Sequence, residues 1–171
     1  MLAFVFLCLA GCSHTISFVN PAERRRDSIS NFILGNTPGD VTAETGETYK
    51  TKWFEFTIQS IDKVDAYKDY KAKEGHRLYK VSISLKSIWD ESIPMGLFDF
   101  YMDAPDFAEY IWAIPPLDGT MMPEAYNLTP GETVQYIMIF EVPTDTAELA
   151  LSYTENYESG EDGATFAIYI D

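Results

Sequence analysis

The chain has 171 residues, with 27 Asp and Glu against 12 Lys and Arg, which gives a formal net charge of −15. Phosphate groups would repel so acidic a surface, and nucleic-acid binding needs basic footprints, so the composition argues strongly against a nucleic-acid ligand. A chain of this length buries roughly 70% of its unfolded surface, which is enough to form a core without disulfides.

The first twelve residues form an unbroken apolar run that is too short to cross a bilayer of ~30 Å hydrocarbon. They have the character of a signal-peptide h-region, and the sequence Leu9-Ala10-Gly11-Cys12 resembles the lipobox of bacterial lipoproteins. The resemblance implies cleavage after Gly11 and lipidation of Cys12. No basic residue precedes the run, which a start codon placed too late would explain. The alternative is a buried first strand in which Cys12 is an ordinary small hydrophobic residue.

Cys8 and Cys12 are the two cysteines of the chain, and cleavage after Gly11 would remove the first. The folded body would then have no disulfide and no cysteine metal ligand, and we expect no cofactor. We predict a signal peptide over residues 1–11, a lipidated N-terminus and tether over residues 12–40, and one domain over residues 41–171. In the tether, the arginines at 24–26 either lie against anionic lipid headgroups or solubilise the segment. The apolar cluster at 29–34 is expected to dock on the domain as a short strand or a turn of helix.

Beyond Val41 the dominant pattern is strict alternation of apolar and polar residues, which predicts strands with one buried face. The predicted inward-facing side chains are Phe54, Phe56 and Ile58, then Tyr79, Val81, Ile83 and Leu85, then Val134, Tyr136, Met138 and Phe140. Ile137 and Ile139 make the opposite face of the third strand apolar as well, so we expect that strand to be central. Further strands are predicted around residues 97–102, 149–153 and 166–170, and no window has a sustained helical stripe.

Turn residues separate the predicted strands. Pro130-Gly131 suits the central positions of a type II turn, Pro143 ends the strand before it, and the glycines at 160 and 163 mark a hairpin bend. Several strands with turns between them indicate an all-β sandwich or barrel in a single domain.

The order of these motifs is similar to that of a known family. The strand at residues 53–58, the charged loop and strand that follow, and the run from Leu128-Thr129-Pro130-Gly131 to Val142-Pro143 resemble the bacterial DUF4352-type domains. The resemblance implies an immunoglobulin-like antiparallel β-sandwich, related in fold to the mycobacterial secreted antigen MPT63 and often found on lipoproteins. It brings no catalytic residues.

The residues offer little for catalysis or metal binding. There is no Gly-x-Ser-x-Gly elbow, and His14 and His76 lie in the predicted tether and in a charged loop. Carboxylate pairs of the kind a glycosidase needs arise by chance among so many acidic residues. The stretch richest in possible calcium ligands contains Glu155, Glu158, Glu161 and Asp162, but a solvated acidic hairpin is favoured and no metal is predicted.

The connection over residues 104–126 is the strongest candidate for a binding surface. It is too irregular for one strand, and its candidate contact residues are Tyr110, Trp112, Met121, Met122 and Tyr126. Aromatic and methionine side chains supply contact area and adapt to partners. The other interpretation, which we favour, is a lid that folds these side chains onto the end of the core.

We therefore expect a membrane-anchored, extracytoplasmic module that binds a protein or an envelope polymer and is not an enzyme. The alternatives are an envelope glycan hydrolase with a carboxylate pair and a structural spacer in a surface assembly. A binding module predicts an exposed apolar patch around Trp112, an enzyme predicts two convergent carboxylates in a cleft, and a spacer predicts neither.

Overall fold

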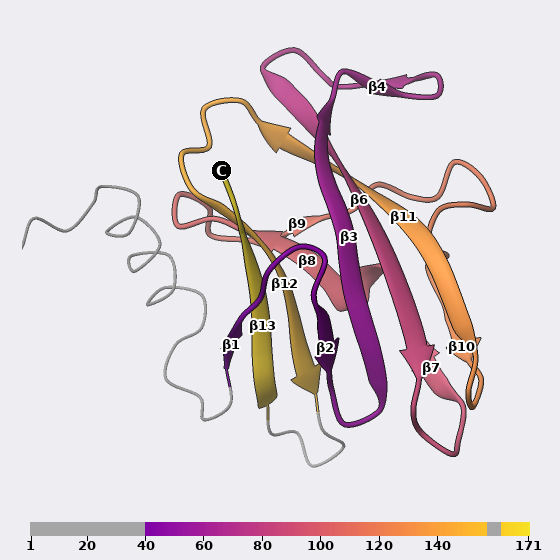
Figure 1. Cartoon of the computed structure of the whole chain (residues 1–171). Coiled ribbons are helices and arrows are strands. Elements are labelled where there is room, and N and C mark those ends of the chain that lie inside the picture. The colour runs from indigo at the N-terminus through magenta and orange to yellow at the C-terminus, as the bar shows by residue number, and fades with distance from the viewer. Residues whose placement is uncertain (1–39, 157–161) are drawn as a thin grey trace, which may run out of the picture.

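The computed structural model describes residues 40–156 and 162–171, and the predicted signal peptide, Cys12 and the tether up to residue 39 lie outside these ranges. The described residues form two packed layers of strands (Figure 1). The strands are β1 (Val41–Thr42), β2 (Thr48–Lys50), β3 (Phe54–Val64), β4 (Ala66–Tyr67), β5 (Tyr70–Lys71), β6 (His76–Ser87), β7 (Ile93–Met95), β8 (Phe100–Asp103), β9 (Ile111–Trp112), β10 (Tyr126–Leu128), β11 (Thr133–Pro143), β12 (Leu149–Asn156) and β13 (Asp162–Ile170). Within the described ranges, no helix is long and apolar enough to span a membrane.

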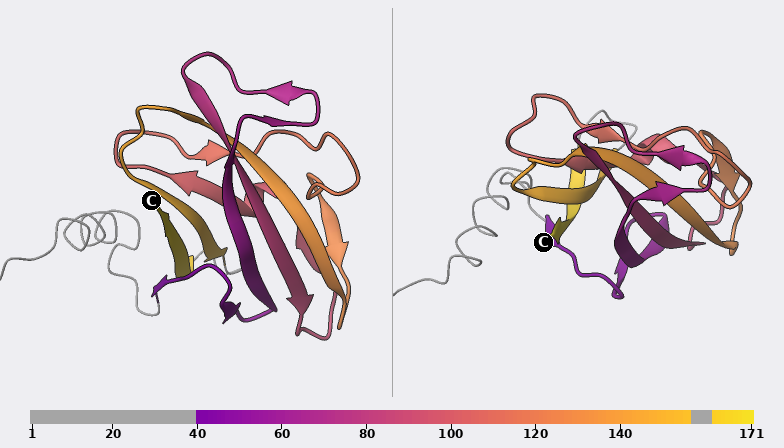
Figure 2. Two further views of the ribbon diagram at one scale, coloured as in Figure 1. Left: turned by 45° about the horizontal axis from the view of Figure 1, so that its top comes forward. Right: turned by 90° about the horizontal axis from the view of Figure 1, so that it is seen from above.

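One layer is a five-stranded sheet in the order β1-β13-β12-β8-β9, and the other is a four-stranded sheet in the order β11-β6-β3-β2. The two layers face each other across the core, as the view from above shows (Figure 2). The pairings are antiparallel except for that of β1 with β13. The expected immunoglobulin-like β-sandwich is confirmed.

The core forms where the alternating strands turn their apolar sides inward. The two inner faces contribute Phe54, Phe56, Ile58, Val81, Ile83, Leu85, Met138 and Phe140 from one sheet, and Phe100, Met102, Leu151, Tyr153, Phe166 and Ile168 from the other. Rings interlock between the layers, because Phe56 lies edge-on to Phe166 at 5.4 Å and Phe54 lies edge-on to Tyr153 at 5.2 Å between ring centroids. Such pairs contribute about 0.5–1.5 kcal/mol each beyond the area that they bury.

The prediction that the third strand is central was wrong. β11 pairs with β6 along its whole length and lies at the edge of the four-stranded sheet. Its second face is apolar because Ile139 is buried there in a small second core with Leu78 and Met121. The connection after β9 covers the free edge of β11, where the Ile114 N–H donates to the Ile139 carbonyl at 2.8 Å.

The turn before β11 forms where Pro130-Gly131 predicts it, whereas Gly163 lies within β13 and Gly160 lies outside the described residues. Gly131 has a φ of +74°, and the Glu132 N–H donates to the Thr129 carbonyl at 3.0 Å, which closes the turn before β11. Another glycine is required by close approach: a Cβ on Gly96 would lie 2.0 Å from the Glu124 carbonyl oxygen. Gly96 thus lets the end of β7 approach the chain that leads into β10.

Candidate functional site

The 104–126 connection divides into an exposed part and a buried part. Tyr110 and Trp112 are 49% and 44% exposed, whereas Met121 and Met122 are buried. Tyr126 is half-buried and packs edge-on against Tyr136 at 5.4 Å. The prediction that Met121 and Met122 line a binding surface is therefore wrong, because their side chains fill the second core and the main core respectively.

The exposed part belongs to a cluster of four aromatic side chains, Phe98, Tyr101, Tyr110 and Trp112, which we call the aromatic cluster. Phe100 and Met102 of β8 point into the core, so Tyr101 between them points outward. The pairing of β8 with β9 places Tyr101 directly opposite Trp112, with their ring centroids 5.8 Å apart. The cluster therefore lies on the outer face of the five-stranded sheet.

The remaining contacts make the aromatic cluster continuous. Tyr110 lies 4.2 Å from Tyr101 and 5.8 Å from Trp112, and Phe98 lies 6.0 Å from Trp112, all between ring centroids. Phe98 is 50% exposed on the short 3-10 helix Leu97–Asp99, at residues where the sequence predicts a strand. Large apolar rings that gather on the surface of a domain mark interaction sites more often than isolated ones do.

Sequence reasoning missed Phe98 and Tyr101. The alternation of β8 could have predicted that Tyr101 faces outward, because it stands between two residues that fit an inward-facing pattern. Phe98 was not, because the turn of 3-10 helix breaks the period of two and reverses the side on which that side chain lies.

The surroundings of the aromatic cluster are acidic. All 12 Lys and Arg residues and both histidines lie at or before Lys86, whereas seventeen of the 27 Asp and Glu residues follow it. The strands β8, β9, β12 and β13 come entirely from this second stretch. Asp103, half-buried two residues after Tyr101 on the same face of β8, is the carboxylate closest in the strand to the rings. Burial raises the pKa of Asp103, although the hydrogen bond that its carboxylate accepts from the Ala104 N–H opposes that shift.

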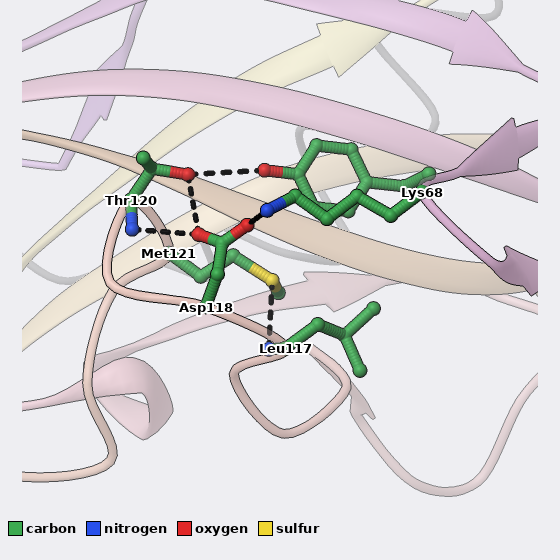
Figure 3. Close-up of polar contacts among 6 residues, drawn as sticks. Lys68, Leu117, Asp118, Thr120 and Met121 are labelled. Carbon is green, nitrogen blue, oxygen red and sulfur yellow. Dashed lines mark hydrogen bonds and ion pairs between the residues drawn. The ribbon is translucent and has the colours of Figure 1, made fainter.

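The buried part of the connection is held by a polar clasp (Figure 3). Asp118 accepts hydrogen bonds from the N–H and the hydroxyl of Thr120, each 2.6 Å long, and forms an ion pair with Lys68. The Tyr67 hydroxyl lies 3.1 Å from the Thr120 hydroxyl. These contacts fasten the β4–β5 hairpin to the connection, and Met121 is enclosed beneath them.

A second clasp joins the same hairpin to β11 through Glu141. Its carboxylate accepts the Tyr70 hydroxyl at 2.9 Å and the Lys73 N–H at 2.6 Å, and the Lys73 ammonium lies 3.0 Å away. Burial alone would raise the pKa of Glu141, but these hydrogen bonds and the Lys73 charge outweigh it, so the pKa is lowered. The sequence predicts only a charged loop here and gives no sign of the hairpin.

The described residues give little support for a catalytic cleft or a metal site. A cavity of about 430 Å³ is lined by Thr45, Ile61, Asp62, Lys63, Tyr79, Tyr169, Ile170 and Asp171. Asp99 and Asp103, whose pKa values are raised by burial, do not line it. Over residues 40–156 and 162–171, no three His, Cys, Asp or Glu side chains are grouped to hold a metal ion.

The predicted calcium segment is described only in part. Glu155 is buried and accepts the backbone N–H groups of Lys52 at 2.9 Å and Ala164 at 3.3 Å, so it holds the sandwich together at this end. Glu158 and Glu161 lie outside the described residues, and so does His14. His76 begins β6, and its Nδ1 lies 3.1 Å from the Glu74 carbonyl oxygen.

Comparison with known proteins shows the fold. No family model and no curated protein sequence matches the chain. Among solved structures it is similar to ycdA of Bacillus subtilis, described as a candidate lipoprotein, with 17% identity and a TM-score of 0.56 over 74% of this chain but only 39% of that one. It is also similar to the yjhA protein of Bacillus subtilis, with 15% identity and a TM-score of 0.56 over 76% of this chain and all of the other.

A third similar structure is MPT63, a secreted protein of Mycobacterium tuberculosis, with 12% identity and a TM-score of 0.52 over 76% of this chain and 98% of that one. At such low identities the similarity establishes a shared β-sandwich and carries no ligand or activity across. The relation to the MPT63 fold expected from the sequence agrees with this result.

Proposed function

We propose that this chain is a lipid-anchored, extracytoplasmic binding module without catalytic activity, and that it contacts a protein or an envelope polymer through the aromatic cluster. The location is supported by the lipobox-like sequence ending at Cys12 and by the fold shared with a secreted protein and a candidate lipoprotein. The single observation that carries the binding role is the exposure of Phe98, Tyr110 and Trp112 in one cluster.

The exposure has a thermodynamic meaning. Each ring that stays in water forgoes burial worth roughly 25 cal/mol for every Å² of its apolar surface. A fold that buries Phe100 and Met102 in the neighbouring strand β8 has the means to bury such side chains. Aromatic rings are also enriched where few residues supply most of the binding free energy of an interface.

Site-specific photocrosslinking in cells that make the full chain tests the binding role. Benzoylphenylalanine replaces Tyr110 in one variant and Lys71, exposed on the hairpin over the other sheet, in the control. We expect position 110 to give an adduct of defined mass and position 71 to give none. Equal adducts at both positions, or none at position 110, would contradict the proposed role of the cluster.

The anchor is tested separately by Cys12→Ala. We expect the full chain to carry acyl groups and to sediment with membranes, and the variant to lose both properties. An unacylated natural chain that retains residues 1–11 in the cytosol would contradict the location.

A further inference from the structure

We infer that the partner bound by the aromatic cluster is cationic, a polypeptide segment that presents arginine side chains to the rings and to Asp103. This inference rests on the proposed function and names the chemistry of the partner. It follows from the geometry of the rings, from the charge around them and from a contact that the same molecule makes elsewhere.

The rings of the aromatic cluster do not form a flat platform. The plane of Trp112 is turned 81° from that of Phe98 and 88° from that of Tyr110. Tyr101 is turned 63° from Trp112 but only 32° from Tyr110, so the rings meet at several angles. Ring faces that meet a cation from different directions hold it in aromatic cages. The arrangement is therefore compatible with a bound cation.

The charges around the aromatic cluster also favour a positively charged partner. After Lys86 the chain has no Lys, Arg or His, and the stretch from Phe98 to Trp112 contains Asp99, Asp103, Asp106 and Glu109. A phosphate polymer or an anionic headgroup would be repelled from this face, and a cation would be drawn to it.

Asp103 lacks a basic partner within the part of the chain that the structure describes. The ion pairs there join Lys68 to Asp118, Lys73 to Glu141 and Lys86 to Glu55, all on or around the four-stranded sheet. Asp103 is half-buried on β8, next to Met102, which pairs with Ile111 of β9. A guanidinium at the rings would give it the opposite charge that its partial burial calls for, and the planar fork of arginine suits both a carboxylate and a ring face.

The molecule already uses this type of contact at another site. The Lys52 ammonium lies 5.4 Å from the ring centroid of Trp53 and 6.0 Å from that of Trp89, within the range of a cation–π interaction. At that site the chain supplies its own cation. At the aromatic cluster the described strands on either side carry no base, and we assign the cation there to a partner.

Calorimetric titration of the full chain in a nonionic detergent tests the inference with two probes at near-physiological salt. One is a peptide of alternating glycine and arginine, and the other has citrulline, the neutral isostere, in place of each arginine. We expect the arginine peptide to bind roughly tenfold more tightly than the citrulline peptide. Trp112→Leu should remove that preference, Trp112→Phe should keep most of it, and Asp103→Asn should reduce it several-fold.

Glu74→Gln is the matched control, because Glu74 is an exposed acid next to β6 on the other sheet. If Glu74→Gln weakens arginine binding as much as Asp103→Asn, and Trp112→Leu has no effect, the attraction is unspecific and the inference is wrong. If both peptides bind with equal affinity and Trp112→Leu abolishes the binding of both, the cationic partner is overturned and the binding surface stands. If neither peptide binds while position 110 still crosslinks, the cationic partner is overturned and the binding surface stands. Loss of the crosslink itself counts against the proposed function. Unchanged thermal midpoints verify that the variants fold.

Discussion

The outer faces of the two sheets differ in what covers them. On the four-stranded sheet, the β4–β5 hairpin and the connection after β9 lie over Leu78 and Ile139, and the clasps at Asp118 and Glu141 hold them there. On the five-stranded sheet, the rings around Trp112 stay exposed at β8 and β9. The 104–126 connection contributes to both faces. Its first part contains β9 with the exposed Trp112, and the part after β9 covers the edge of β11.

The distribution of bases explains part of this difference. Each clasp needs a lysine, and Lys68 and Lys73 come from the half of the chain that holds every basic residue. The strands of the five-stranded sheet that lie after Lys86 have acidic and aromatic side chains without a lysine to hold a covering segment. The covered face is thus the one to which a lysine-bearing hairpin is fastened.

Truncating one residue from each part of the connection should show the largest contrast. We expect Met122→Ala to lower the free energy of unfolding by about 2–5 kcal/mol, because it leaves a cavity in the main core. Trp112→Ala should lower it by about 1 kcal/mol or less, because its ring is largely exposed and loses only contacts within the cluster. Urea unfolding of both variants measures the difference, and equal losses would mean that the cluster is part of the core.

Removing the charge of one clasp should have a smaller, pH-dependent effect. The folded-state pKa of Glu141 is lowered from its usual 4.5, so its charge stabilises the fold above that value, and the stabilisation is lost as the pH falls through the folded-state pKa. We expect Glu141→Gln to cost about 1 kcal/mol near neutral pH, and the difference from the natural chain to vanish in acid. Thermal unfolding of the two proteins over a pH series measures this, and a difference that is constant with pH would contradict the role of the charge.

The sequence predicted the elements whose side chains alternate and missed those held by local polar contacts. The buried sides of β3 and β6 follow from Phe54 to Ile58 and Tyr79 to Leu85, because a period of two is a property of the strand itself. The β4–β5 hairpin has only two residues in each strand, and depends on contacts with Thr120 and Glu141 far along the chain. No local pattern could reveal such contacts.

The same limit applies to the candidate site. Tyr110 and Met122 are both apolar residues of one proline-rich connection, and the sequence cannot tell which of them stays outside. The pairing of β8 with β9 decides it by placing Trp112 beside Tyr101 on the outer face. The second apolar face of β11 led to the wrong prediction of a central strand for a related reason. A covering connection buries a side chain as well as a neighbouring strand does, so the pattern does not distinguish the two.

The most direct test of the binding surface uses the three tryptophans, Trp53, Trp89 and Trp112, as internal probes. The full chain is labelled with 5-fluorotryptophan, each fluorine resonance is assigned by a Trp→Phe variant, and the arginine peptide is added. The account predicts that the Trp112 resonance shifts while that of Trp89, which is 38% exposed at another site, keeps its position. A shift confined to Trp89, or a spectrum that does not change, would contradict it.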